Sequence, residues 1–315
     1  MKKIIAILLL LTVLLSACES KTPQETTTTP TTVETTIPIP EVDWMTLPAE
    51  REISATQYFV YDCETKEFII KAKDITTKIY PASITKLFTA YVALQYLDAS
   101  KPVTAGDVIK TIDPDSSLAW IRKGDVLTVE QLIAGMLLPS GNDATYVLAE
   151  EAGRAMYGEN GKTVSTNAAL DRFVKEMNNQ AKLLGLNGTK FANPDGIHAD
   201  NHYTTYADLA VIGTLILEDP IIMKYTAVSS MDAELPSADV TWKNTNAIID
   251  PNSEYYCSLC TGLKTGQTHM AGSCLLTAFE YRGRSLIIGV FGCKEMDDRF
   301  PDTLQLFNRA VGISQ

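Results

Sequence analysis

The order of the expected elements constrains the fold more than any other feature of the sequence. Near the start of the folded region, residues 57–61 and 68–71 are apolar and rich in β-branched and aromatic side chains, and the polar stretch between them indicates a hairpin. Near its end, residues 262–268, 273–280 and 285–291 have the same character. Strands are therefore expected at both ends of the folded region, and they can share one sheet if the chain returns to its start.

The middle of the chain has the spacing of helices. Apolar residues between Leu87 and Leu97 recur at helical intervals within residues 83–97, and Thr128-Val-Glu-Gln131 matches a capping box that opens a helix to about Leu138. Further helices are expected at 143–152, 169–184, 206–217 and 302–311. This order favours the α+β class: an antiparallel sheet of about five strands flanked by helices, with a helical subdomain beside it.

The N-terminus has the features of a targeting segment. Lys2 and Lys3 precede an apolar stretch over residues 4–15, which is too short to span a bilayer comfortably and is typical of a signal peptide. The stretch ends in Leu15-Ser-Ala-Cys18, which resembles the bacterial lipoprotein signal. We expect residues 1–17 to be a signal peptide and Cys18 to carry a lipid. An ordinary signal peptide with a chance cysteine is the alternative.

Residues 20–48 form a low-complexity tract of Thr, Pro and Glu that has few residues able to build a core. We expect residues 18–49 to be the lipidated cysteine and an extended tether, and residues 50–315 to be the folded domain. The net charge of −11 argues against a nucleic-acid partner, because such binding depends on clustered Lys and Arg.

Cysteines and histidines do not form a convincing metal site. If Cys18 is lipidated, five of the six cysteines remain, so at least one stays free. Cys257-Ser-Leu-Cys260 has no second ligand pair, which favours a buried pair or a local disulfide over zinc. His198, His202 and His269 are too scattered for zinc and are interpreted as structural or rim residues.

Ser83-Ile-Thr-Lys86 is the first segment that suggests chemistry. Positions i and i+3 share one face of a helix, so the Lys86 amine can reach the Ser83 hydroxyl. A hydroxyl becomes a good nucleophile only when a base takes its proton, and a lysine serves as that base only if its pKa is lowered. The motif alone is weak, because a surface helix face can carry the same residues.

Two further segments have a similar character. Ser140-Gly-Asn142 interrupts the helical pattern, so its hydroxyl and amide could face a cleft, although such residues are also common in simple turns. Lys264-Thr-Gly266 lies on an expected strand, where the glycine would let a substrate backbone approach and the lysine would lower the pKa of Lys86 and attract a carboxylate. An ordinary edge strand with a lysine is the alternative.

Together the three segments occur in the order of the penicillin-binding protein and class A β-lactamase signature. The chain resembles the low-molecular-weight penicillin-binding proteins, the serine D-Ala-D-Ala carboxypeptidases, over residues 50–315. The blocks that carry the resemblance are Tyr80-Pro-Ala-Ser-Ile-Thr-Lys86, Leu138-Pro-Ser-Gly-Asn-Asp-Ala144, Asn193-Pro-Asp-Gly-Ile-His198, Asn201-His-Tyr-Thr-Thr205, Thr261-Gly-Leu-Lys-Thr-Gly266, and Gly292 with Arg299.

The resemblance implies a role for each site residue. Ser83 would be the nucleophile and Lys86 its base, with Ser140 and Asn142 in the proton relay and substrate contacts. Substrate would lie along a strand that contains Lys264, Thr265, Gly266 and Gln267, and the backbone N–H groups of Ser83 and Gln267 would form the oxyanion hole. Arg299 would help to hold the terminal carboxylate; a surface residue balancing Asp297 and Asp298 is the alternative.

The implied reaction removes the terminal D-Ala from peptidoglycan stem peptides and needs no cofactor or metal. Expected partners are those peptides, β-lactams as inhibitors and, through the lipid, the bacterial cell membrane on the side that faces the wall. A β-lactamase is one alternative, but no Glu-x-x-Leu-Asn element follows Asn142. A non-catalytic penicillin sensor or wall-binding lipoprotein is the other, and the intact Ser83 and Lys86 argue against it.

Overall fold

A computed structural model describes residues 52–312 of the chain. The expected signal peptide, Cys18 and the tether over 18–49 lie outside the described residues. None of the described helices combines the length and the apolar character needed to cross a membrane.

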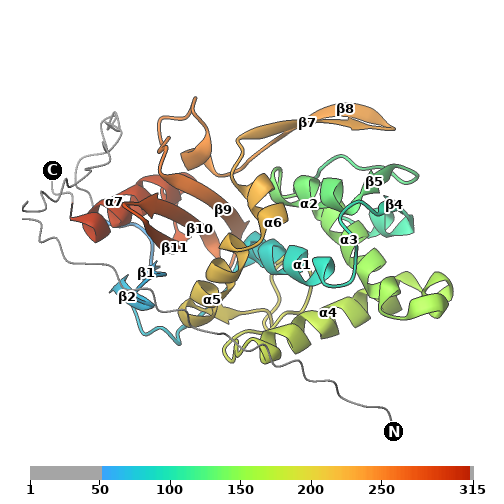
Figure 1. Ribbon diagram of the computed structural model, residues 1–315, viewed down its shortest axis with the longest axis horizontal. Coiled ribbons are helices and arrows are strands. Elements are labelled where there is room, and N and C mark those ends of the chain that lie inside the picture. The colour runs from blue at the N-terminus through green and yellow to red at the C-terminus, as the bar shows by residue number, and fades with distance from the viewer. Residues whose placement is uncertain (1–51, 313–315) are drawn as a thin grey trace, which may run out of the picture. The chain divides into compact units, whose positions relative to one another are not determined.

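One antiparallel sheet of five strands joins the two ends of the described chain, as the sequence predicts (Figure 1). Its strand order is β2-β1-β11-β10-β9, so the first hairpin pairs directly with the last strand. The five strands are β1 (Gln57–Asp62), β2 (Glu67–Lys71), β9 (Cys260–Thr268), β10 (Gly272–Tyr281) and β11 (Arg284–Cys293). β9 lies at one edge of this sheet, with β10 as its only strand neighbour there.

Neighbouring residues of a strand point to opposite faces, and this alternation divides the core in two. On one face, Leu275 and Ile288 pack in the same cluster as Phe307 of α7 (Arg299–Val311). On the other face, Leu276 and Ile287 belong to the larger cluster that includes residues of α1 (Thr85–Leu94) and α5 (Tyr206–Leu217). Both faces of the sheet are therefore buried against helices, which fixes β9 relative to α1.

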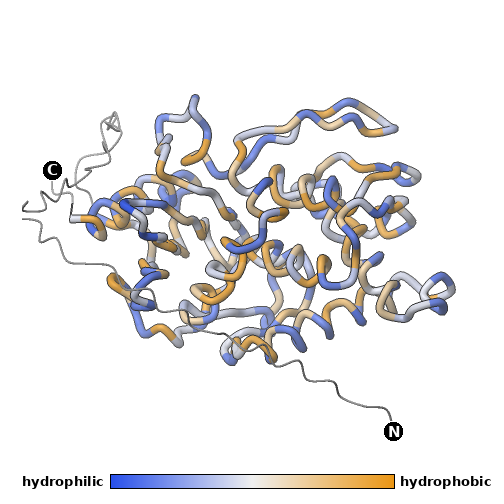
Figure 2. Tube along the Cα trace, in the orientation of Figure 1, coloured by the Kyte–Doolittle hydropathy of each residue, from blue (hydrophilic) through white to orange (hydrophobic). Residues whose placement is uncertain are grey.

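Apart from α7, six α-helices of the described region lie against the other face of the sheet or beside it (Figure 1). They are α1 (Thr85–Leu94), α2 (Val129–Leu137), α3 (Asn142–Ala155), α4 (Thr166–Leu183), α5 (Tyr206–Leu217) and α6 (Pro220–Thr226). Both hydrogen bonds of the predicted capping box at Thr128 and Gln131 are present. The alternating colours along α4 in Figure 2 reflect its single buried side, where Phe173 and Met177 pack.

Several short elements were not predicted. They are β3 (Lys78–Ile79), β4 (Pro102–Thr104), β5 (Val126–Thr128), β6 (Thr204–Thr205), β7 (Ser230–Leu235), β8 (Ala238–Lys243) and the helix α6. Strands of two or three residues leave no periodic pattern, and the polar β7 has little β propensity. The hairpin of β7 and β8 is held by tertiary contact instead, since Trp242 is buried and donates a hydrogen bond to the carbonyl of Ala119 at 2.9 Å.

Two helix starts differ from the predicted ones in ways that concern the site. α3 begins at Asn142, so the Ser140 turn runs directly into its first residue. α7 begins at Arg299, three residues before the predicted start at 302, which places Arg299 in the first turn of a packed helix.

Candidate active site

Ser83 and Lys86 lie together at the start of α1. A 3-10 turn over Ala82–Ile84 leads directly into the helix, and the Lys86 Nζ atom donates a hydrogen bond to Ser83 Oγ over 2.8 Å. Ser83 is half-buried, whereas Lys86 is fully buried. A second hydrogen bond, 2.9 Å from Lys86 Nζ to the carbonyl oxygen of Asp195, holds the amine in place. The amine therefore faces the hydroxyl that it is expected to deprotonate.

Burial lowers the pKa of Lys86 to about 8, and the acidic groups of Asp195 and Asp143 partly oppose that shift. The sequence led us to expect a lowered pKa from burial and from repulsion by Lys264. Burial alone lowers the pKa of Lys86, whereas repulsion between the two cations acts on Lys264, whose pKa is lowered first by burial and then by Lys86. A lysine with such a pKa can accept a proton near neutral pH.

Lys264 and Thr265 stand in the middle of β9. The Nζ atom of Lys264 donates to the carbonyl of Thr265 at 3.1 Å and to the hydroxyl of Thr245 at 3.3 Å. Thr245 also hydrogen-bonds the hydroxyl of Thr265, and its backbone N–H donates to the carbonyl of Leu138 at 3.2 Å. Thr245 thus links β9 to the turn that carries Ser140, a connection that no local pattern in the sequence indicates.

Gly266 brings β9 against the nucleophile. A Cβ atom at this position would lie 3.1 Å from the backbone nitrogen of Ser83 and 2.9 Å from the carbonyl oxygen of Pro81. Only a residue without a side chain permits this approach. The next residue, Gln267, is exposed at the edge of the sheet. An edge strand so placed can pair with an extended peptide while the peptide's carbonyl lies near Ser83.

Arg299, the first residue of α7, packs against β9 rather than lying at the surface. Its side chain is buried, with 6% of the residue exposed, and Nη1 lies 3.5 Å from the carbonyl oxygen of Gly266. Among the described residues, its Nε atom has no hydrogen-bond partner. The alternative of a surface arginine is therefore wrong. Burial lowers the pKa of Arg299, and the nearby charge of Asp297 partly opposes that shift.

Ser140 lies in the turn between α2 and α3, Asn142 is the first residue of α3, and both are buried. Ser140 has a positive φ of 63°, and Gly141 is required because a Cβ there would lie 2.7 Å from the carbonyl oxygen of Gly135. The following residue, Asp143, interacts electrostatically with Lys86. The side chains of Ser140 and Asn142 make no direct hydrogen bond to Ser83 or Lys86 within the described part of the chain.

The segment 193–198 contributes a group whose role was not predicted. The sequence motif that contains Asp195 indicates no role for this residue, yet its carbonyl contacts Lys86 and its buried carboxyl interacts with the same amine. The motif was the available signal, but it did not indicate where the side chain would lie.

His202 is structural, as the sequence suggested. Its Nδ1 atom accepts the backbone N–H of Ala192 at 3.2 Å, so Nε2 carries the proton and donates to the Thr85 hydroxyl at 2.8 Å. His198 packs edge-on against Tyr80, and His269 is exposed in the turn after β9. The five described cysteines, including Cys257 and Cys260, are free thiols.

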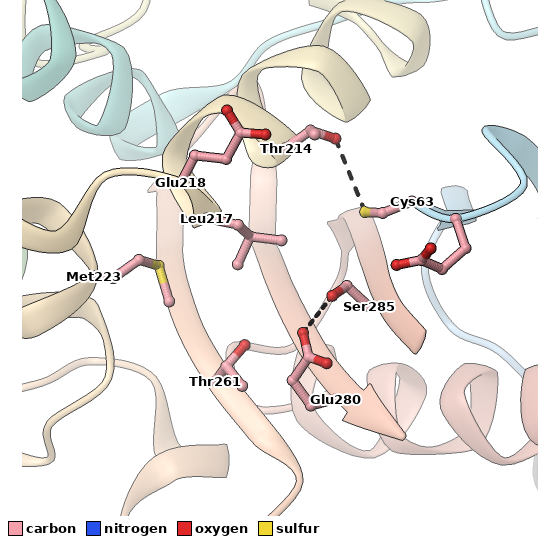
Figure 3. A pocket seen from close by; sticks show the side chains of 9 residues that line it. Cys63, Thr214, Leu217, Glu218, Met223, Thr261, Glu280 and Ser285 are labelled. Carbon is pink, nitrogen blue, oxygen red and sulfur yellow. Dashed lines mark hydrogen bonds between the residues drawn. The ribbon is translucent and has the colours of Figure 1, made fainter. Parts of the chain in front are cut away.

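A pocket of about 400 Å³ lies elsewhere, between α5 and the sheet (Figure 3). Cys63 contacts the hydroxyl of Thr214 at 3.8 Å on one side of it, and Ser285 hydrogen-bonds Glu280 on another. None of the predicted site residues lines this pocket.

Comparison with known proteins identifies relatives of this chain. The sequence profile of the D-alanyl-D-alanine carboxypeptidase family matches residues 44–295. The chain is 28% identical to D-alanyl-D-alanine carboxypeptidase DacF of Bacillus subtilis over 73% of its own length and 56% of that protein's, and 29% identical to DacA of Escherichia coli K12 over 82% and 61%. It thus spans less than two thirds of the length of these two relatives.

A shorter relative matches over most of its length. The D-alanyl-D-alanine carboxypeptidase of Streptomyces sp. K15 is 32% identical to this chain, over 77% of this chain's length and 82% of the length of that protein. The crystal structure of the Streptomyces K15 DD-transpeptidase superposes with a TM-score of 0.74 at 27% identity and covers 84% of this chain and 100% of that one. From the matching profile and these relatives, we conclude that the chain belongs to the D-alanyl-D-alanine carboxypeptidase family.

Proposed function

We propose that the protein is a serine-type D-Ala-D-Ala carboxypeptidase that removes the terminal D-Ala from peptidoglycan stem peptides and is acylated by penicillin. The observation that carries this proposal is the hydrogen bond of 2.8 Å between a half-buried Ser83 hydroxyl and the fully buried Lys86 amine, whose pKa is about 8. Membership of the family supplies the substrate class. The chemistry is then acyl transfer through Ser83.

In the first step, the proton of Ser83 moves to Lys86 while Oγ forms a bond to the carbonyl carbon of the penultimate D-Ala. The oxyanion that forms would accept hydrogen bonds from the backbone N–H groups of Ser83 and Gln267, which Gly266 brings close together. The C–N bond then breaks, and the leaving amine takes the proton from Lys86 through Ser140, which returns Lys86 to its neutral form. Water hydrolyses the resulting ester, which releases the shortened peptide and restores the Ser83 hydroxyl.

The substrate would lie along the free edge of β9, with its terminal carboxylate toward Lys264 and Arg299. Both cations are buried, Lys264 on this strand and Arg299 against it, and Arg299 has a donor that is unused by the described residues. Asn142 would contact a substrate amide. A carboxylate binds most strongly to cations that are already shielded from water, and arginine can hold it with two parallel hydrogen bonds.

Mass spectrometry of the intact protein with penicillin tests the proposal. The wild type should gain one penicillin, Ser83→Ala should gain none while it unfolds at a similar temperature, and Ser100→Ala, at an exposed serine, should behave as the wild type. An adduct of unchanged mass in Ser83→Ala would refute the nucleophile. Repeated release of D-Ala from Ac2-Lys-D-Ala-D-Ala separates a carboxypeptidase from a sensor, which is acylated once and then stops.

We further propose that Cys18 carries a lipid that anchors the enzyme on the outer side of the cell membrane, so that it faces the wall. The apolar stretch before Leu15-Ser-Ala-Cys18 supports this localisation. Cys18→Ala should move the protein from the membrane to the soluble fraction without changing its activity on a soluble peptide. Persistent membrane binding of that variant would show that another anchor holds it.

A further inference from the structure

Asp195 places a buried carboxyl group beside the expected general base. Only 1% of the residue is exposed. Its Oδ1 atom accepts the backbone N–H of Ile197 at 3.2 Å, while Oδ2 is buried with no hydrogen-bond partner among the described residues. Burying a carboxyl oxygen without a partner is costly, so this arrangement requires an explanation other than stability.

The loop around Asp195 is fixed against the nucleophile. Asn193 accepts the N–H of Gly196 at 2.8 Å and donates to the carbonyl of Ile197 at 2.7 Å, which closes the loop on itself. Gly196 packs so tightly that a Cβ there would lie 1.8 Å from the carbonyl oxygen of Ala82. With the hydrogen bond from Lys86 to the Asp195 carbonyl, these contacts hold the carboxyl group in one place relative to Lys86.

The charged and titratable groups around Lys86 come from several elements. α3 supplies Asp143 and Tyr146, and β9 supplies Lys264, which in turn interacts with Arg299 of α7. The two oxygens of Asp143 are occupied by the backbone N–H groups of Ala119 and Ile121, at 2.8 and 2.9 Å.

Tyr146 remains neutral, because burial and Asp195 raise its pKa. Of the two acids that interact with Lys86, Asp195 is therefore the one that retains an oxygen without a hydrogen bond.

Building on the proposed function, we propose that Asp195 is a positioning residue whose carboxylate stabilises the ammonium form that Lys86 adopts when it takes the proton of Ser83. In that step the O–H bond of Ser83 breaks, an N–H bond forms at Lys86 and the serine oxygen bonds to the acyl carbon. Burial raises the pKa of the Asp195 carboxyl, whereas the charge of Lys86 and the backbone N–H of Ile197 lower it, so the ammonium form of Lys86 favours the carboxylate. Lys86 becomes cationic in this step, and Asp195 exchanges no atom. An aspartate beside a histidine base acts in the same way in serine proteases, where it orients the base and stabilises its protonated form.

The pKa of Lys86 is therefore set by two opposing effects. Burial lowers its pKa and makes the neutral amine available, whereas the Asp195 carboxylate raises its pKa and makes the amine a stronger base. Removing the carboxylate should therefore lower the pKa of Lys86 further. The amine would be neutral at lower pH but would accept the serine proton less readily.

The pH dependence of the acylation rate constant with penicillin tests this role, measured for the wild type, Asp195→Asn and the control Asp200→Asn. Asp200 lies in the same segment but is exposed. In Asp195→Asn the acidic limb of the pH–rate profile, where the rate constant rises with pH, should move to lower pH by on the order of one unit. The rate constant on the high-pH plateau should fall roughly threefold to tenfold. Asp200→Asn should match the wild type.

Each other outcome overturns the proposal. An unshifted acidic limb in Asp195→Asn would show that the carboxylate does not act on Lys86, and an equal loss at every pH would show a structural role. Asp195→Ala, which removes the charge without a polar group to bury, must shift the limb in the same direction. If neither variant folds, the carboxyl is a structural group. Failure of the wild type to be acylated at all would instead refute the proposed function.

Discussion

The backbones of Gly266 and Ser83 lie so close that a Cβ at position 266 would stand 3.1 Å from the Ser83 nitrogen. The same atom would lie 2.9 Å from the Cβ of Ala82 and from the carbonyl oxygen of Pro81. Two of these neighbours are backbone atoms that cannot move without shifting the nucleophile. The contact therefore sets the distance between the strand expected to bind substrate and the hydroxyl expected to attack it.

Gly266→Ala should consequently slow acylation by penicillin about a hundredfold, because displacing a reacting group by about 1 Å has an effect of that size. The thermal unfolding midpoint should change little, since one edge strand moves slightly. Gly106→Ala is the matched control, because its Cβ would meet only the Glu150 side chain at 3.7 Å. Normal acylation by Gly266→Ala would mean that the strand can move away without consequence.

Lys86→Ala should reduce the acylation rate constant by about two to four orders of magnitude, the usual contribution of a general base. In the wild type the rate should rise with pH through about 8, because burial lowers the pKa of Lys86 to that value and the neutral amine is the base. Lys110→Ala, at an exposed lysine, serves as the control. A loss of only a few-fold in Lys86→Ala would assign the base to another residue.

His202 should make the folded state sensitive to acid. Burial lowers its pKa from 6.5 to about 4, so the unfolded chain takes up the proton at a higher pH than the folded chain does. Its contribution to stability is complete above about pH 6.5 and is lost as the pH falls toward 4, a change on the order of 3 kcal/mol.

Chemical unfolding at pH 8 and pH 5 measures this effect. His202→Gln should be less stable than the wild type at pH 8, because it loses its hydrogen bonds to Thr85 and Ala192, but its stability should fall less between the two values. His269→Gln, at an exposed histidine, should follow the wild type. Equal pH dependence in all three proteins would exclude His202 as the source.

The fold and the positions of the main site residues could be predicted because their signals are local. The apolar runs of β10 and β11 reflect burial on both faces, and the i, i+3 spacing that joins Ser83 to Lys86 follows from helix geometry. That strands from both ends of the chain share one sheet also followed from the chain order, whereas the pairing of β1 with β11 in particular was not predicted.

Contacts between distant residues could not be predicted in the same way. The hydrogen bond from Lys86 to Asp195 joins residues 109 positions apart, and that from Thr245 to Leu138 depends on how two loops meet. The buried position of Arg299 follows from an earlier start of α7, and helix ends are poorly marked in sequence. Such features depend on tertiary packing, which local patterns do not contain.

Arg299 provides the test of how the enzyme would recognise a chain end. Only the end of a peptide has a free main-chain carboxylate, and Lys264 of β9 and Arg299 of α7 are both buried cations. Arg299→Ala should reduce kcat/KM for Ac2-Lys-D-Ala-D-Ala by about tenfold to a hundredfold, the effect of a charged hydrogen bond of about 1.5–3 kcal/mol. For an uncharged ester substrate kcat/KM should fall far less, because that substrate has no carboxylate to bind.

Arg122→Ala, at an exposed arginine, is the control for both substrates. Equal losses on the two substrates in Arg299→Ala would show that Arg299 supports the packing of α7 against β9, and recognition of the carboxylate would then depend on Lys264 alone.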